Sequence, residues 1–222
     1  MKKRTITTSV FALFLLSGAV GTQKYISSQI TSRVEREMPK ASGVRASIPL
    51  ADVPSNIASD SIKRVIVDID SYFLKENNTK TSLKITAKNI SKSKPTLIGS
   101  LDVTATIPEA TIIKSSEFND ARIVGDTLQV SVGPGGAGTA VLSPKYSNNQ
   151  LFFEIQSVSF MGREIPASSL PSDLQSQVKS RSQRSLAPPK GLEVQSVSLS
   201  SKGLSLKMLG NNIQLANLGS AL

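Results

Sequence analysis

Apolar and polar residues alternate along most of this chain, and this period of two constrains its fold more than any other feature. The segment 62–73, "IKRVIVDIDSYF", places Val65 and Val67 on one face and Asp68 and Asp70 on the other. Similar alternation recurs at 83–87, 97–107, 127–132, 139–142, 151–160, 192–199, 204–208 and 213–215. Successive side chains of a strand point to opposite faces, so the pattern predicts strands with one buried and one solvent-exposed face.

Short clusters of turn-forming residues separate these segments. They lie at 76–80, 125–126, 147–149, 200–203 and 210–212. Alternating strands joined by short turns are typical of an antiparallel meander. We therefore expect an α+β fold in which residues 44–215 are mostly antiparallel sheet.

Helical sequence is scarce and lies mainly near the N-terminus. Residues 22–38, "TQKYISSQITSRVEREM", place Ile26, Ile30 and Val34 four residues apart among polar neighbours. This spacing predicts an amphipathic helix with a narrow apolar ridge, which ends before Pro39. The other helices that the sequence predicts are short and begin after Pro49, after Pro108 and near Pro171.

A long sheet with one apolar face needs a cover, because exposed apolar surface costs about 25 cal/mol per Å². The predicted helices are too few to cover such a sheet. We therefore expect a strongly curved sheet that wraps the 22–38 helix and leaves a concave apolar surface. The residues that alternation assigns to this surface are Val65, Val67, Ile69, Phe73, Leu83, Ile85, Leu101, Val103, Leu128 and Val130.

The first 21 residues have the pattern of an export signal. A basic cluster at positions 2–4 precedes an apolar run and then the small residues Ala19 and Gly21. The uncharged gap between Arg4 and Lys24 also approaches the roughly 20 residues that span a bilayer. A cleaved signal peptide and a retained signal anchor both stay open. In either case residues 22–222 are predicted to form a single exported domain, in the periplasm or cell envelope or on the outer side of the plasma membrane.

The composition excludes several kinds of active site. The chain has no histidine and no cysteine, which rules out histidine-dependent catalytic triads, thiol nucleophiles and the usual zinc sites. The segment "GPGGAG" fits the pattern G-x-G-x-x-G, but a short strand ended by Pro144 follows it where a nucleotide site needs a helix. We interpret it as a glycine-rich hairpin, and we expect neither a cofactor nor a bound metal.

Two further patterns are weak indications of catalysis. Ser-x-x-Lys spacing occurs at Ser91–Lys94 and Ser176–Lys179, without the other motifs of Ser-Lys enzymes. Asp68 and Asp70 share a strand face, where carboxylates usually face solvent beside basic cross-strand neighbours. We expect a protein that is not an enzyme, with an envelope Ser-Lys hydrolase as an alternative.

The chain is strongly basic, with a formal charge of +10. With positions 2–4 set aside, 23 basic residues stand against 16 acidic ones, a surplus of +7. Such a surplus attracts anionic surfaces, so a polyanion-binding scaffold is a second alternative. Few aromatic residues accompany the basic ones, and we expect no nucleic-acid partner. The densest basic stretch, 179–190, offers three candidates for contact with phosphate: Lys179, Arg181 and Arg184.

The order of these features resembles the LmeA-like phospholipid-binding family of bacterial envelope proteins. Four segments between about residues 42 and 215 carry the resemblance: "ASDSIKRVIVDIDSYF", "LIGSLDVTATIP", "QLFFEIQSVSFMGREIP" and "PPKGLEVQSVSLSSKGLSLKMLG". The resemblance implies a tubular lipid-binding architecture, in which a bent sheet wraps a helix and holds acyl chains. It also implies a membrane-associated, extracytoplasmic lipid carrier or accessory factor in envelope lipid or lipoglycan assembly, whose partners are phospholipid and the membrane surface.

Overall fold

A computed structural model describes residues 23–37, 41–53, 56, 59–74, 79–115, 120–132, 136–186 and 188–214. The predicted export signal at 1–21 lies outside these residues. Within them, no helix combines the length and the apolar character that a membrane crossing requires. Antiparallel sheet predominates and helices are few, so the expected sheet-rich α+β class is confirmed.

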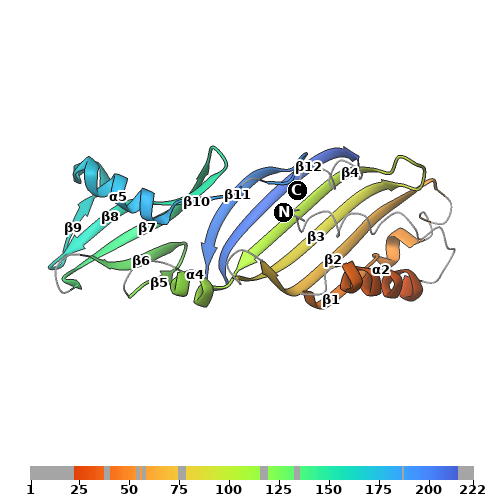
Figure 1. Cartoon of the computed structure of the whole chain (residues 1–222), viewed down its shortest axis with the longest axis horizontal. Coiled ribbons are helices and arrows are strands. Elements are labelled where there is room, and N and C mark those ends of the chain that lie inside the picture. The colour runs from red at the N-terminus through yellow and green to blue at the C-terminus, as the bar shows by residue number, and fades with distance from the viewer. Residues whose placement is uncertain are drawn as a thin grey trace, which may run out of the picture. The chain divides into compact units, whose positions relative to one another are not determined.

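Sheet A has six strands in the order β1–β2–β3–β4–β12–β11 (Figure 1). The pairs β1–β2 and β2–β3 are antiparallel, and β1 to β4 follow one another as the meander predicts. Strand β12, near the end of the described chain, lies beside β4. The strands are β1 (Ala41–Ser47), β2 (Ser61–Leu74), β3 (Thr79–Ser91), β4 (Leu97–Ile107), β11 (Glu193–Ser200) and β12 (Gly203–Gln214).

Sheet B is a second six-stranded sheet, in which β10, β8, β7, β6 and β5 follow in that order and β9 also pairs with β8. All of these pairs are antiparallel. The glycine-rich segment therefore joins two antiparallel strands, β6 and β7, and the predicted hairpin is confirmed. The strands are β5 (Arg122–Val124), β6 (Thr127–Val132), β7 (Gly138–Ser147), β8 (Gln150–Phe160), β9 (Arg163–Pro166) and β10 (Arg184–Ser185).

Three α-helices with described bounds lie close to their predicted positions. They are α2 (Gln23–Glu37), α4 (Glu109–Ser115) and α5 (Ser172–Ser182), and two 3-10 turns cover Leu50–Asp52 and Ala167–Ser169. The apolar ridge of α2 is buried at Ile30 and Val34. This helix packs against the edge strand β1 (Figure 1). Sheet A is not strongly curled, so the predicted wrap of a curved sheet around this helix is not confirmed.

The chain forms two compact units. Unit 1 comprises Met1–Ala105, Pro188–Gln195 and Lys207–Leu222, and unit 2 comprises Thr106–Ala187 and Ser196–Leu206. The boundary falls within β4, β11 and β12, so each of these strands contributes residues to both units. Units that share continuous strands can unfold as one. This division therefore does not test the predicted single domain over 22–222, which stays a prediction.

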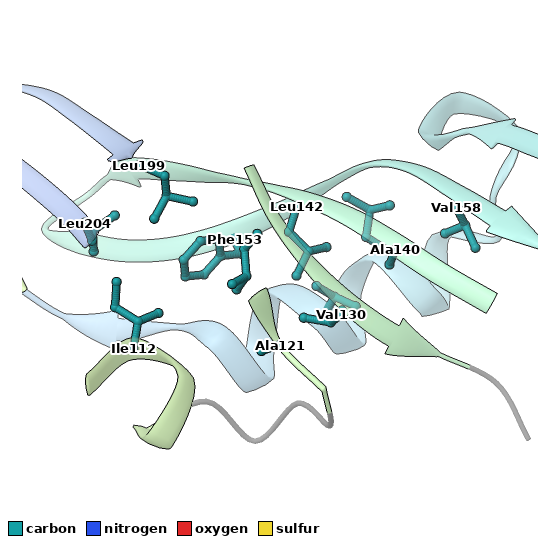
Figure 2. Packing of buried hydrophobic residues seen from close by; sticks show 12 residues of the cluster. Ile112, Ala121, Val130, Ala140, Leu142, Phe153, Val158, Leu199 and Leu204 are labelled. Atoms are coloured by element: carbon teal, nitrogen blue, oxygen red, sulfur yellow. The ribbon is translucent and has the colours of Figure 1, made fainter. Parts of the chain in front are cut away.

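Unit 2 has a closed apolar core (Figure 2). Strands of sheet B supply Leu128, Val130 and Leu142, and helices α4 and α5 supply Ile112 and Val178. Two further core residues come from the unit 2 parts of β11 and β12, namely Leu199 and Leu204. Leu128 and Val130, predicted for the concave lipid surface, are thus packed among side chains in the core of unit 2.

Two breaks that the sequence predicts in strands do not occur. Strand β7 continues through Pro144, which pairs with Phe153, whereas β6 pairs with β7 only as far as Leu142. Proline is tolerated where a strand has a neighbour on one side only. Strand β12 runs through the predicted turn at 210–212. A Cβ at Gly210 would meet the carbonyl oxygen of Gly191, so this glycine allows a close backbone approach and marks no turn.

Candidate lipid-binding face

The buried face of sheet A in unit 1 is built from matched rows of apolar residues. On β2 and β3, Val65 pairs with Ala87, Val67 with Ile85, and Ile69 with Leu83. Residues that pair directly across an antiparallel ladder share one face. Strand β4 adds two buried residues at the same alternation, Leu101 and Val103. We call these eight residues the inner face, and seven of the ten residues predicted for a lipid surface belong to it.

A bulge in β2 changes the inner face at one end. The pairing with β3 shifts between Ile69 and Tyr72, so that Tyr72 lies opposite Thr81 and Phe73 lies opposite the exposed Lys80. The register therefore places Tyr72, and not Phe73, in line with Ile69. The side chain of Phe73 lies outside the described residues. An inserted residue of this kind reverses the alternation beyond it, which a regular pattern cannot anticipate.

The bulged end of the inner face carries hydroxyl groups. Thr81 shares its β3 row with Leu83 and Ile85, and its Oγ1 is buried without a hydrogen-bond partner. Tyr72 is buried beside it in register, and desolvation raises the pKa of its phenol. This phenol is therefore neutral at physiological pH. Sequence reasoning did not single out either residue, because threonine and tyrosine are ordinary strand formers.

Apart from the half-buried Leu83, the inner face is closed to solvent. Val65 and Leu101 are 0% exposed and Val67 is 1% exposed. The described helix α2 packs beside this face at β1, where the backbone N–H of Ala46 donates to Thr31 Oγ1 at 3.2 Å. A ligand would therefore have to displace groups that now pack against these residues.

The chemistry available on the inner face is limited to apolar contact and hydrogen bonding. None of its eight side chains ionises, and no group of three or more metal-binding side chains occurs in the described part of the chain. Such a surface can hold hydrocarbon but supplies neither an acid nor a base.

The three basic residues predicted for headgroup contact lie elsewhere. Lys179 Nζ stands 4.4 Å from the centroid of the Phe152 ring, and Arg184 donates to the carbonyl oxygen of Gln183 at 2.9 Å. The side chain of Arg181 is outside the described residues. All three belong to unit 2, whereas the inner face belongs to unit 1. The lipid-surface residues on β2, β3 and β4 and the headgroup residues that the sequence predicts therefore belong to different units.

The serine of the first Ser-x-x-Lys pair has a structural role. Ser91 Oγ accepts a hydrogen bond from the N–H of Leu97 at 2.9 Å and donates to the carbonyl oxygen of Ser93 at 3.4 Å. It thereby closes the loop between β3 and β4. Ser176, in the second pair, is exposed on α5, where its partner Lys179 lies over an aromatic ring.

The carboxylates of β2 have basic neighbours, as predicted for a solvent-exposed face. Asp70 accepts two hydrogen bonds from the Arg45 guanidinium, at 2.5 and 2.7 Å, and this contact lowers the pKa of Asp70. Asp68 pairs in register with both Arg45 and Lys84. A Cβ at Gly43 would collide with the Asp70 side chain, so the glycine leaves room for this ion pair.

Comparisons with known proteins supply no family for this chain. It matches no family model, and it has no significant match among curated proteins or solved structures. The likeness to LmeA-like proteins therefore stays a prediction from the sequence, and functional argument has to come from the inner face and its surroundings.

Proposed function

We propose that this protein binds phospholipid at the extracytoplasmic side of a membrane, as a lipid carrier or an accessory factor in envelope lipid or lipoglycan assembly. The observation that supports this most is the inner face of unit 1, a continuous apolar surface without ionisable groups. On β2 it extends from Val65 to Ile69, about 13 Å at about 3.3 Å per residue, and the row continues past the bulge to the buried Tyr72. One leaflet of a bilayer holds about 15 Å of hydrocarbon, so an acyl chain fits along this row.

The polar end of the inner face suits the other part of a phospholipid. Tail and headgroup are joined through ester and phosphate oxygens, which accept hydrogen bonds. Thr81 Oγ1 is a buried hydroxyl without a partner, in line with the apolar row of β3. In the proposed complex the tail lies along Val65, Val67 and Ile69, and the Thr81 hydroxyl donates to an ester or phosphate oxygen.

The energetics favour exchange with a membrane over irreversible capture. Removing an acyl chain from water gains about 0.8 kcal/mol per methylene, but a bilayer interior offers the same gain. For the hydrocarbon itself, transfer between a bilayer and the inner face is therefore nearly balanced, as a carrier requires, and displacing the groups that pack on this face is the remaining cost. In this proposal the tubular arrangement forms when the sheet closes around the bound tail.

A photoreactive lipid tests the proposal directly. We would incubate the protein with phosphatidylglycerol that carries a diazirine in its acyl chain, irradiate it, and locate the adducts by mass spectrometry. Adducts are expected on the inner-face residues of β2, β3 and β4. Adducts confined to exposed residues would overturn the proposal.

A pair of variants on one strand provides the control. Ile85→Asn places an amide on the inner face, whereas Thr86→Asn changes the neighbouring position on the opposite face. We expect Ile85→Asn to abolish the adducts and Thr86→Asn to retain them. Circular dichroism confirms that each variant is folded, and the adduct map of the unmodified chain decides the question if Ile85→Asn fails to fold.

A further inference from the structure

The basic surplus of the chain is unevenly divided between its two units. With positions 2–4 set aside, the sequence of unit 1 holds 15 basic and 9 acidic residues, a net charge of +6. The sequence of unit 2 holds 8 basic and 7 acidic residues, a net charge of +1. The part of the basic stretch that holds Lys179, Arg181 and Arg184 therefore stands in a nearly neutral unit, and attraction to anions belongs chiefly to unit 1.

Much of the charge on the outer face of sheet A is neutralised locally. We use the name outer face for the side opposite the inner face. Arg45 pairs with Asp70. Lys207 on β12 pairs with Asp102 on β4 at 3.4 Å. Arg64 on β2 lies 3.5 Å from Asp52. Among the described residues of the outer face, these pairs leave the lysines of β3 without a salt bridge.

Three lysines form a row along the outer face of β3: Lys80, Lys84 and Lys88. All three are exposed and occur at every second outward position of the strand. None makes a salt bridge or side-chain hydrogen bond within the described part of the chain, although Lys84 stands opposite Asp68 in register. Lys88 stands opposite a second basic residue, Arg64.

The spacing of the row indicates the kind of anion that it fits. Four residues of a strand span about 13 Å, so neighbouring lysines are about 13 Å apart and the whole row extends for about 26 Å. Side chains at this separation cannot converge on one small anion. They fit an extended array of negative groups, and three separate ammonium groups that point away from a sheet face complement a plane of phosphates.

We propose that the lysine row of β3 docks the protein on an anionic phospholipid surface, with each ammonium group beside a headgroup phosphate. This inference deepens the proposed function, because it names the surface that meets the membrane, and it replaces the predicted headgroup contacts of unit 2. Each lysine near an anionic bilayer contributes about fivefold to affinity, so the row contributes roughly a hundredfold. Salt weakens the contact, because the lysines are exposed.

Lysine footprinting with vesicles tests the docking face on the full chain. We would acetylate the protein with a limiting amount of an N-hydroxysuccinimide ester, alone and with vesicles of equal parts phosphatidylglycerol and phosphatidylcholine. Mass spectrometry then gives the reactivity of each lysine. The row is expected to become several-fold less reactive on these vesicles and to stay unchanged on pure phosphatidylcholine. Equal protection of lysines in both units would overturn the proposal.

Matched triple variants provide the second arm. Changing the three row lysines to glutamine is expected to weaken vesicle binding roughly a hundredfold. The control replaces three exposed lysines of unit 2 with glutamine and so removes the same charge. These lysines are Lys114, Lys145 and Lys202. The control is expected to weaken binding less than fivefold, and equal losses in the two variants would contradict the proposal. Because the substitutions are exposed, melting curves should show both variants folded.

Two outcomes separate this inference from other possibilities. If soluble polyphosphate protects the row as strongly as vesicles do, the partner is a polyanion and the membrane proposal is wrong. If the acyl-chain probe gives no adducts on the inner face but vesicles still protect the row, lipid binding at the inner face is wrong and membrane docking stands. If adducts form on the inner face but the row is not protected, only the docking face is wrong.

Discussion

The two units of the molecule use apolar residues in different ways. In unit 2, the strands of sheet B meet α4, α5 and the adjoining parts of β11 and β12 around one cluster (Figure 2). In unit 1, the apolar residues form long parallel rows on one face of sheet A, and its described helix packs at the edge strand β1. The comparison teaches that equally buried residues can serve different roles. The filled core of unit 2 stabilises the fold, whereas the uniform apolar inner face of unit 1, without ionisable groups, also suits an apolar ligand.

The largest expected effect compares the same substitution in both units. Leu142 in unit 2 and Leu101 in unit 1 are each 0% exposed. Leu→Ala at a buried site costs about 2–5 kcal/mol, and the cost is smaller where the surroundings can adapt. In urea unfolding, we expect the loss in free energy of unfolding to be near the upper limit for Leu142→Ala and near the lower limit for Leu101→Ala. Equal losses at both sites would show that the inner face is as rigidly filled as the core of unit 2.

A smaller effect is expected at the polar end of the inner face. Thr81→Val replaces the unpartnered hydroxyl by a methyl group of similar size. Because an unsatisfied buried polar group costs about 1–3 kcal/mol, the variant should gain about 1 kcal/mol in the free energy of unfolding of the lipid-free protein. The same variant should retain less phospholipid. A destabilised variant would indicate that the hydroxyl already has a partner.

The smallest expected effect concerns the ion pair at the edge of sheet A. The hydrogen bonds from Arg45 lower the pKa of Asp70 from the ordinary aspartate value. The pair therefore stabilises the fold fully above the ordinary aspartate pKa, and this contribution is lost as the pH falls through the lowered value. Both groups are exposed, so the change is slight. Melting temperatures of the unmodified chain and Arg45→Gln, measured from pH 6 to about pH 2, should differ at the upper end and converge at the lower end.

Local patterns predicted much of the fold because they depend on neighbours in sequence. The spacing of Ile30 and Val34 located α2, and alternation gave the bounds of β4 and β6. Strand β1 lacks a regular apolar pattern and was predicted only in part. Its pairing depends on β2, 25 residues away at the Arg45–Asp70 contact.

Other features depend on groups that meet only after folding. The passage of β12 through Gly210 follows from the approach of Gly191. The bulge before Tyr72 and the unpartnered Thr81 hydroxyl arise from the pairing of β2 with β3. The concentration of charge in unit 1 becomes visible only when the chain is divided as the fold divides it.

The most direct test of lipid binding is mass spectrometry of the protein purified from its cells without detergent. We predict that the folded protein carries phospholipid and that Ile85→Asn, but not Thr86→Asn, removes it. A folded, unmodified protein that emerges free of phospholipid, and that takes none up from vesicles, would contradict the account.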